Sequence, residues 1–334
     1  MHKGLIVTEA GKKSGLGHVQ RCLSIVQAFE EKSILIEMIV VGDSSIKQLK
    51  INSIITILNN WKNAIATIKK ISPDLQFLII DSYKITSKQL EELKTLNIEI
   101  CILDDNQRLD YINSVIINGT VDAEKFTYDN SNDLLLGSKY IPLRKAFWKR
   151  SENLTAMQIE KILITFGGSD TRGLSVQISN WVALNYPNTT VSVLATNAFE
   201  TTQLKALKDN KNIELILNPN DEAIKKAMKN ADIAVSAGGQ TLYELACLGI
   251  PAVAIKVIEN QSNNIKGWED FGFIKNVGNW NDKQLLTNLK NCIDEMESSE
   301  VRKQQAMIGK KHVDGQGARR IVKHILKNEN IILN

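Results

Sequence analysis

Long hydrophobic runs are missing from this sequence. No uninterrupted apolar stretch approaches the ~18 residues that a membrane-spanning helix needs, and the best candidate, residues 33–41, carries Glu37 in its middle. The first seven residues lead directly into a short strand-like segment, without the apolar stretch and cleavage site of a secretory signal. We therefore expect no stable membrane insertion and no signal peptide.

Cysteine is scarce as well. The four cysteines, Cys22, Cys101, Cys247 and Cys292, are widely spaced and form no CxxC pair. This spacing argues against a disulfide framework and against a zinc site, and it suits small buried side chains in a reducing compartment. A cytoplasmic location follows as an expectation.

The net charge is small. Lys and Arg together number 41 and Asp and Glu 37, which leaves a formal charge of +4. An excess of this size, spread over 334 residues, gives no argument for a polyanionic partner. We therefore expect no nucleic acid as a partner, and oligomeric state stays open.

What is present is an alternation of apolar runs with segments of helical period. Runs that are apolar on both faces are typical of parallel strands covered by helices on each side. The length favours two domains, and the pattern lapses between residues 138 and 160. We therefore predict two doubly wound α/β domains with a cleft between them, residues 1–148 and 149–334, and a helical tail whose last helix covers residues 315–327. The expected strands are residues 5–7, 34–41, 75–80, 98–103, 115–117, 161–166, 191–194, 213–217, 233–235 and 252–257.

Histidine is scarce among the chemically useful residues, with four copies. His18 follows Gly15-Leu16-Gly17 in the loop that enters the first helix, where glycines let a ligand approach the backbone and helix N–H groups face an anion. The spacing lacks the third glycine of the dinucleotide fingerprint and the GK[ST] of a phosphate-binding Walker loop. A histidine here suits general-base chemistry, and packing against the loop is the equally open alternative. The remaining histidines, His2, His312 and His324, are expected to be solvated or terminal.

Two further glycine-rich turns follow strands of the second half. Gly167, Gly168 and Ser169 could meet phosphate oxygens, although a tight turn capped by Ser169 or Asp170 explains them equally well. The second turn is more specific: Gly238 and Gly239 end a strand, Thr241 opens a helix, and Glu244 lies one turn in. Such a turn can hold a diphosphate while the carboxylate accepts both ribose hydroxyls, and an ordinary capping box from Thr241 to Glu244 is compatible with both roles.

Several polar residues complete the set of candidates. The run from Glu259 to Asn264 offers amides for sugar hydroxyls, and other candidates are Tyr83, Asn118, Arg144 and the pair Asp104-Asp105. Because neighbouring residues of an extended segment point opposite ways, we expect at most one of the two aspartates to face a ligand.

At these residues the sequence resembles a known family, the UDP-2,4-diacetamido-2,4,6-trideoxy-β-L-altropyranose hydrolases of pseudaminic acid biosynthesis. These hydrolases share the GT-B fold with glycosyltransferases such as the one that adds N-acetylglucosamine to a lipid-linked muramyl pentapeptide. The resemblance covers nearly the whole chain. The segments that carry it are Gly15–His18 with Arg21-Cys22, Asp81–Tyr83, Leu103–Asp105, Ile162–Asp170, Ser236–Pro251, Glu259–Gln261 and Asp314–Arg320.

The resemblance implies a GT-B fold and a reaction in which water attacks the anomeric carbon of a UDP-sugar and UDP leaves with inversion. His18 matches the family's proposed general base, Tyr83 and Asn260 match residues of its sugar site, and no metal or cofactor is implied. We expect substrate contacts from Gly15, Gly17, Arg21, Tyr83, Asp105, Arg144, Asn260 and Gln261, and nucleotide contacts from Gly167, Gly168, Ser169, Gly238, Gly239, Thr241 and Glu244.

The loop from Thr8 to Ser14 departs from the family, which has an Asp-Ala-Ser-like stretch there. That departure leaves the sugar and the acceptor open. A glycosyltransferase of the same fold, with a hydroxyl acceptor in place of water, is the alternative, and a non-catalytic nucleotide-sugar binding protein is a third hypothesis. The absence of a strongly amphipathic basic helix favours the hydrolase over an enzyme with a lipid-linked acceptor.

Overall fold

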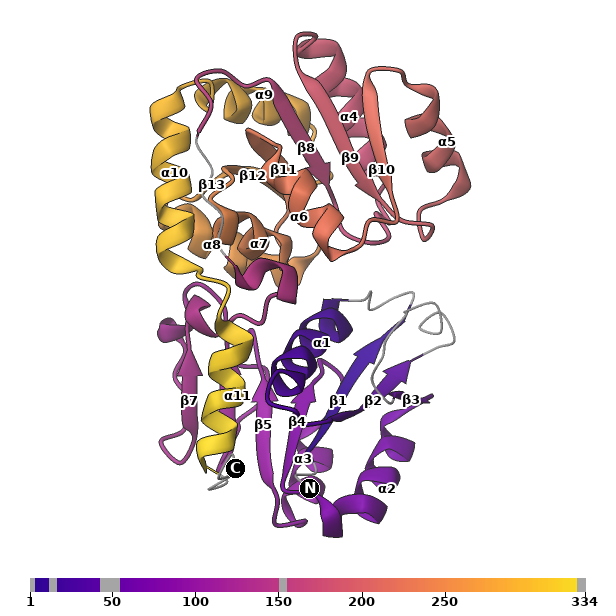
Figure 1. Ribbon diagram of the computed structural model, residues 1–334, viewed down its shortest axis with the longest axis vertical. Coiled ribbons are helices and arrows are strands. Elements are labelled where there is room, and N and C mark those ends of the chain that lie inside the picture. Colours follow the sequence, from indigo (N-terminus) through magenta and orange to yellow (C-terminus); the bar gives the residue numbers. More distant parts are fainter. Residues whose placement is uncertain (1–3, 12–16, 43–54, 150–154, 329–334) are drawn as a thin grey trace. The chain divides into compact units, whose positions relative to one another are not determined.

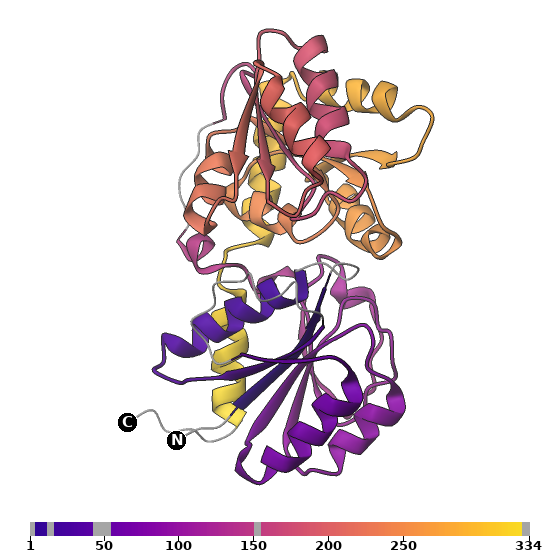
Figure 2. The ribbon, with the colours of Figure 1, turned by 90° about the vertical axis from the view of Figure 1, so that its right-hand side faces the viewer.

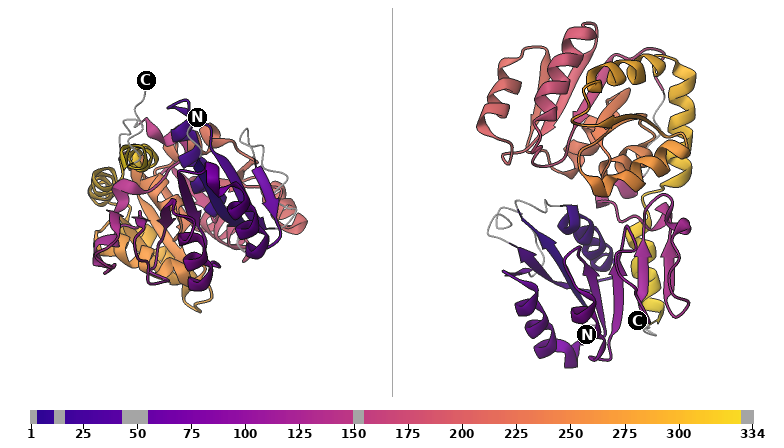
Figure 3. Two further views of the ribbon diagram at one scale, coloured as in Figure 1. Left: turned by 90° about the horizontal axis from the view of Figure 1, so that it is seen from below. Right: turned by 180° about the vertical axis from the view of Figure 1, so that it is seen from behind.

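The computed structural model describes residues 4–11, 17–42, 55–149 and 155–328. Two compact units are present (Figures 1 and 3). Unit 1 comprises Met1–Lys145 with Gln316–Asn334, and unit 2 comprises Ala146–Gly315. Among the described residues, no helix is both long enough and apolar enough to span a bilayer.

Unit 1 is built on a parallel sheet of seven strands in the order β3-β2-β1-β4-β5-β6-β7. Most of the central strand residues are fully buried, as expected for strands covered on both faces. The strands are β1 (Gly4–Ala10), β2 (Glu37–Gly42), β3 (Ile55–Leu58), β4 (Phe77–Asp81), β5 (Glu99–Leu103), β6 (Val115–Asn118) and β7 (Asp133–Leu136).

Four α-helices cover this sheet. Figure 2 shows α1 (Gly17–Glu30) and α11 (Gly317–Asn328) on one face and α2 (Trp61–Ile71) and α3 (Ser87–Lys94) on the other. The apolar stripe of α2 packs on the sheet, and Thr86 begins α3 with a capping box to Gln89. Short 3-10 helices occupy Ser72–Asp74, Ala123–Lys125, Ser138–Tyr140 and Lys145–Trp148.

Unit 2 repeats the plan with six parallel strands in the order β10-β9-β8-β11-β12-β13. The strands are β8 (Lys161–Thr165), β9 (Thr190–Ala195), β10 (Ile213–Leu217), β11 (Ile233–Ala237), β12 (Ala252–Lys256) and β13 (Ile274–Asn279). The helices are α4 (Leu174–Asn185), α5 (Thr201–Asp209), α6 (Asp221–Lys229), α7 (Thr241–Leu248), α8 (Ser262–Asp270), α9 (Leu285–Glu295) and α10 (Ser299–His312), with a 3-10 turn at Glu259–Gln261.

Each sheet has, near its centre, a pair of adjacent strands from which the chain runs outward in opposite directions. In unit 1 the chain runs outward from β1 in one direction and from its neighbour β4 in the other, and in unit 2 β8 and β11 stand in the same relation. The loops after such a pair diverge and leave a crevice at the carboxyl ends of the strands, which is where open α/β sheets bind ligands. The turns that hold Tyr83, Gly167 and Gly238 each follow one of these four strands, and so does the helix α1 that begins with Gly17 and His18.

The predicted fold class is confirmed, and the predicted division of the chain needs one correction. The second domain was expected to run from 149 to 334, but α11 packs in unit 1, against α1 and beside β7 (Figures 1 and 3). Its apolar face is fully buried there, as Ile321 and Ile325 show, and Arg319 forms a two-pronged ion pair with Glu31 at 2.7 Å. The periodicity of the helix showed that it has a buried face, but not which unit buries it.

Candidate active site

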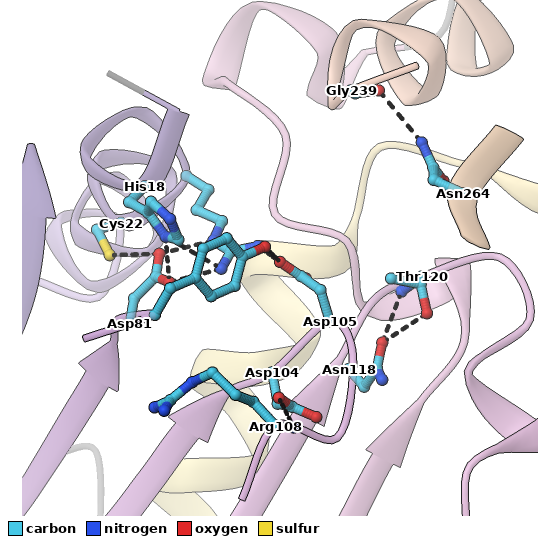
Figure 4. A network of polar contacts seen from close by, with 12 residues as sticks. His18, Cys22, Asp81, Asp104, Asp105, Arg108, Asn118, Thr120, Gly239 and Asn264 are labelled. Carbon is cyan, nitrogen blue, oxygen red and sulfur yellow. Dashed lines mark hydrogen bonds and ion pairs between the residues drawn. The ribbon is translucent and has the colours of Figure 1, made fainter. Parts of the chain in front are cut away.

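His18 lies on the first turn of α1, directly after the loop that follows β1. Its Nδ1 is 2.7 Å from Asp81 Oδ1, and Asp81 is the last residue of β4 and is fully buried (Figure 4). The register that pairs β1 with β4 places Thr8 opposite Asp81, so the two strand ends are adjacent. The histidine and the carboxylate therefore meet at the carboxyl ends of β1 and β4, the two strands from which the chain of unit 1 runs outward.

The contact with Asp81 fixes the histidine tautomer. An ionised carboxylate only accepts hydrogen bonds, so Nδ1 must carry the ring proton and donate a hydrogen bond to Asp81. The neutral ring then has its lone pair on Nε2, as a general base requires. Arg21 Nη2 lies 3.3 Å from the same Nδ1 because both groups donate to Asp81 Oδ1, Arg21 at 2.5 Å.

Arg21 joins two carboxylates, one turn further along α1. Its Nε donates to Asp81 Oδ2 at 2.6 Å, and its Nη1 donates to both oxygens of Asp105 at 2.8 Å. Burial raises the pKa of the Asp81 carboxyl, but Arg21 and His18 outweigh it and hold this pKa well below its usual range. Burial likewise lowers the pKa of Arg21, yet Asp105 and Asp81 keep it well above its usual value. Asp81 and Arg21 are therefore oppositely charged partners in a buried hydrogen-bond network.

Tyr83 closes this network from the β4–α3 turn. Its hydroxyl donates to Asp105 Oδ2 at 2.5 Å, and its ring meets His18 edge-on with the centroids 4.5 Å apart. Burial, followed by the Asp105 carboxylate, raises the pKa of Tyr83 far above its usual value. Tyr83 is thus a neutral hydrogen-bond donor and cannot serve as a base near neutral pH.

The turn that carries Tyr83 is held by Glu9, the penultimate residue of β1. Glu9 is almost fully buried; its Oε1 accepts from the Tyr83 backbone N–H at 3.1 Å and its Oε2 from the Ser82 hydroxyl at 2.9 Å. Glu9 and Asp81 are the residues that the sequence-based assignment missed. The available signal was that strands ended in acidic residues at the edge where ligands bind, but their partners lie more than 60 positions away.

The two neighbouring aspartates point opposite ways, as expected. Figure 4 shows Asp105 and Asp104 pointing to different surroundings: Asp105 meets Arg21 and Tyr83. Asp104 is buried and accepts hydrogen bonds from the Tyr128 and Tyr111 hydroxyls at 2.5 and 3.2 Å. Asn118 is also structural: its amide donates to Tyr128, and its carbonyl accepts from Thr120. Asp104 and Asn118 therefore stabilise the segments that follow β5 and β6.

The other unit 1 candidates are less constrained. Gly17 is the exposed first residue of α1, with open space where a Cβ would stand, and Arg144 is half-buried in the β7–β8 connection, between the 3-10 helices at Ser138–Tyr140 and Lys145–Trp148. Gly15 and His2 lie outside the described residues. His324 is not simply solvated, because its Nε2 is 2.7 Å from Asp133 Oδ2. His312 packs on the Phe271 ring, and burial lowers its pKa.

In unit 2 the turn after β8 presents Gly167, Gly168 and Ser169. Gly167 has φ +82°, a conformation that favours glycine, and open space surrounds both glycines. The start of α4, however, is already occupied: Asp170 accepts from the N–H groups of Leu174 and Ser175 at 3.0 and 2.7 Å. The capping interpretation is thus confirmed at Asp170, and a ligand at this turn would meet the glycines instead of the α4 N–H groups at Leu174 and Ser175.

The turn after β11 is more tightly built. Asn264 of α8 donates to the Gly238 carbonyl at 2.6 Å (Figure 4 shows its second contact, to Gly239), and Tyr243 donates to the Asn264 side chain. Thr241 is the first residue of α7, one position after Gln240, whose side chain makes no capping bond. Glu244 lies on the same short helix and is buried.

Gln261 lies against this turn. Its Oε1 accepts from the Val257 backbone N–H at 2.9 Å, and its Nε2 is 3.9 Å from the position that a Cβ on Gly239 would take. Asn260 is exposed on the same 3-10 turn. The structure thus brings Gln261, Gly238 and Gly239 together within unit 2. Among the described residues, no three His, Cys, Asp or Glu side chains are grouped as metal ligands would be.

Solved structures of the same architecture match nearly the whole chain. Acinetobacter baumannii MurG superposes with a TM-score of 0.67 at 16% identity, over 97% of this chain and 99% of that one. The S. aureus MnaA–UDP co-structure gives a TM-score of 0.67 at 13% identity, over 100% and 98% of the two chains.

A curated relative is also similar in sequence. It is the "pseudaminic acid cytidylyltransferase and UDP-2,4-diacetamido-2,4,6-trideoxy-beta-L-altropyranose hydrolase" of Helicobacter pylori, 27% identical over 299 residues. The alignment covers 88% of this chain and 50% of that protein, so the chain spans half of the relative's length. Together these likenesses establish that the chain has the GT-B fold, and its residues 162–325 match the glycosyltransferase family 28 C-terminal domain.

Proposed function

We propose that the protein is an inverting hydrolase of a UDP-sugar, with His18 as the general base. The observation that supports this most directly is the Asp81–His18 pair, because a buried carboxylate that is ionised at neutral pH, placed on Nδ1, leaves Nε2 as the basic atom. A site that only binds a nucleotide sugar has no need of such a pair.

The proposed reaction is a single displacement at the anomeric carbon of the sugar. The oxygen of water attacks the anomeric carbon while its proton passes to His18 Nε2. The bond between that carbon and the diphosphate oxygen breaks, its electron pair leaves with UDP, and the configuration at the carbon inverts. Asp81 stabilises the imidazolium that forms, and the Tyr83 ring packs against it with the two ring planes nearly perpendicular.

Unit 2 supplies the proposed nucleotide contacts. Backbone N–H groups of the Gly238–Gly239 turn and the start of α7 would hold the diphosphate, whose leaving charge they stabilise. Glu244 would accept the ribose hydroxyls, and Gly167, Gly168 and Ser169 would approach the phosphates. The UDP bound by the MnaA structure of similar fold supports this type of ligand.

The sugar we propose is the 2,4-diacetamido-2,4,6-trideoxy-altropyranose unit of pseudaminic acid biosynthesis. Its support is the name of the Helicobacter pylori relative together with the matching segments around His18, Tyr83 and Asn260. The match to a glycosyltransferase domain over residues 162–325 favours one second candidate, transfer of the sugar to a hydroxyl acceptor.

Labelled water tests the proposal. The protein is incubated with the UDP-linked diacetamido sugar in H₂¹⁸O without any acceptor. Hydrolysis by attack at carbon places the label in the free sugar and leaves UDP unlabelled. Absence of turnover until a hydroxyl acceptor is added would instead show a transferase, and absence of turnover under either condition would leave a binding protein.

A pair of histidine variants tests the base. We expect His18→Ala to keep its affinity for UDP and to lose turnover by about 10²–10⁴-fold, the usual contribution of a general base. His324→Ala is the matched control, because His324 also contacts a carboxylate, Asp133, but lies on α11. Full activity of His18→Ala would disprove the role.

A further inference from the structure

Unit 2 also contains a pocket whose walls include Val257 and Glu259, the first residue of the 3-10 turn at Glu259–Gln261. It has a volume of about 460 Å³ and is formed at the carboxyl ends of β12 and β13 together with Arg172 from the loop after β8. Its walls include Lys256, Glu259, Asn279 and Trp280. None of the seven residues assigned to the nucleotide lines it.

Arg172 is the main feature of this pocket. Its guanidinium lies over the Trp280 ring at 4.4 Å from the centroid, and Trp280 is anchored in turn by a backbone hydrogen bond to the Lys256 carbonyl at 2.9 Å. A cation–π contact of this kind positions the guanidinium without using any of its N–H donors, which leaves them able to hydrogen-bond a ligand. No carboxylate in the described part of the chain pairs with Arg172.

The other charges of the pocket largely cancel. Lys256 Nζ contacts Glu259 at 3.0 Å and the Ser262 hydroxyl at 3.2 Å. Arg172 therefore leaves one positive charge in excess, beside the Asn279 amide and the half-exposed apolar side chain of Ile258. An arginine fixed in this way favours a planar or tetrahedral oxyanion that can take two parallel hydrogen bonds.

We propose that this pocket binds a small molecule through a phosphate or carboxylate group held by Arg172, at a site separate from the nucleotide. Arg172 shares the β8–α4 loop with Gly167–Ser169, but the opposite wall of the pocket, at Trp280 after β13, stands two strands beyond β11, roughly 10 Å away at ordinary strand spacing. The volume suits a ligand of metabolite size. The inference does not depend on the reaction proposed above.

Indole N–H signals in a ¹H–¹⁵N spectrum of the full chain report on the pocket, with Trp280→Phe assigning the Trp280 signal. Inorganic phosphate and acetate are titrated separately against sodium chloride at equal ionic strength. We expect a saturable shift of the Trp280 signal with at least one of the two anions. Phosphate alone identifies a phosphate-bearing ligand, acetate alone a carboxylate-bearing one, and no shift beyond that with chloride overturns the proposal.

Two variants sharpen the result. Arg172→Gln should weaken anion binding about tenfold or more, since it removes a charge-assisted pair of hydrogen bonds. Lys211→Gln, which removes one exposed positive charge elsewhere in unit 2, should leave it unchanged. The shift must also persist at saturating UDP, because displacement by UDP would assign the pocket to the nucleotide site and refute its independence.

Discussion

At the scale of single residues, the Asp81 carboxylate fixes more of the site than His18 does. It receives hydrogen bonds from His18 Nδ1 and from two nitrogens of Arg21, and it has no exposure to water. Each of these donors would be left facing a buried site without an acceptor if the carboxylate were removed. The orientation of the proposed base is thus tied to the stability of unit 1.

The first prediction concerns pH and stability. The pKa of Asp81 is lower in the folded chain than its usual value, so its contribution to the free energy of unfolding is complete above that usual pKa and is lost as the pH falls towards the folded pKa. Asp81→Asn should cost about 3 kcal/mol near pH 7, and the difference from the wild type should shrink below about pH 4. Urea unfolding between pH 7 and pH 2 measures it.

The exposed Asp209→Asn variant is the control for that series, and it should show no comparable pH-dependent gap. A gap between wild type and Asp81→Asn that widened towards pH 3 would contradict the assignment of Asp81 as the ionised partner.

The second prediction concerns Glu9. Glu9→Ala removes the acceptors of the Tyr83 backbone N–H and the Ser82 hydroxyl, so the turn that presents Tyr83 should loosen and kcat should fall roughly tenfold, the equivalent of one lost hydrogen bond. Glu9→Gln should lose much less, because its carbonyl oxygen still accepts from the Tyr83 N–H while the Ser82 hydroxyl rotates. Steady-state kinetics of both variants decide; equal losses in Glu9→Gln and Glu9→Ala would disprove a positioning role.

The sequence allowed the chemistry of His18 to be predicted but not its partner. A rare histidine after a glycine loop is a local pattern, whereas the Asp81 contact joins positions 63 residues apart. The alternation rule for extended segments did separate Asp105 from Asp104, because it depends only on neighbours in the chain. Long-range pairing needs the strand order, which periodicity alone does not supply.

At the scale of elements, the strands that escaped prediction are β3, β7 and β13, and each lies at an edge of its sheet. Edge strands are covered less completely, so they need not be apolar on both faces. The residues of β7 begin with an exposed Asp133 and Leu134, and β13 contains Lys275 and Asn276. The inner strands were predicted because burial on both faces demands a continuous apolar run.

The third prediction separates two adjacent glycines of the β11–α7 turn. A Cβ on Gly238 would stand 2.3 Å from Ile265 Cγ1, whereas a Cβ on Gly239 meets nothing closer than 3.9 Å. Gly238→Ala should therefore destabilise unit 2 by about 1–3 kcal/mol, the usual cost of overpacking. Gly239→Ala should fold normally and, if this turn holds the diphosphate, bind UDP more weakly. Thermal unfolding and UDP titration of both variants test the pair.

The UDP affinity of Gly239→Ala reports on function alone, provided that its thermal unfolding matches that of the wild type. Unchanged UDP affinity in a normally folded Gly239→Ala protein would argue against the turn as the diphosphate site.

At the scale of the whole molecule, the chain does not divide at a single point. It completes unit 2 at Gly315 and then returns to unit 1, where α11 covers the same face as α1. The closing bend is tightly packed: a Cβ on Gly317 would stand 2.0 Å from the Ile141 carbonyl oxygen. The stability of unit 1 therefore depends on residues at the far end of the sequence.

The fourth prediction follows from this return. Ile321 of α11 is fully buried, so Ile321→Ala should cost about 2–4 kcal/mol. The loss should appear in unit 1, as faster amide exchange in β1 and β4, and not in β8 and β11. Ile293→Ala in α9, equally buried, is the matched control and should show the opposite pattern. Hydrogen exchange followed by mass spectrometry distinguishes the two, because a second domain that ran unbroken to the C-terminus would place both losses in unit 2.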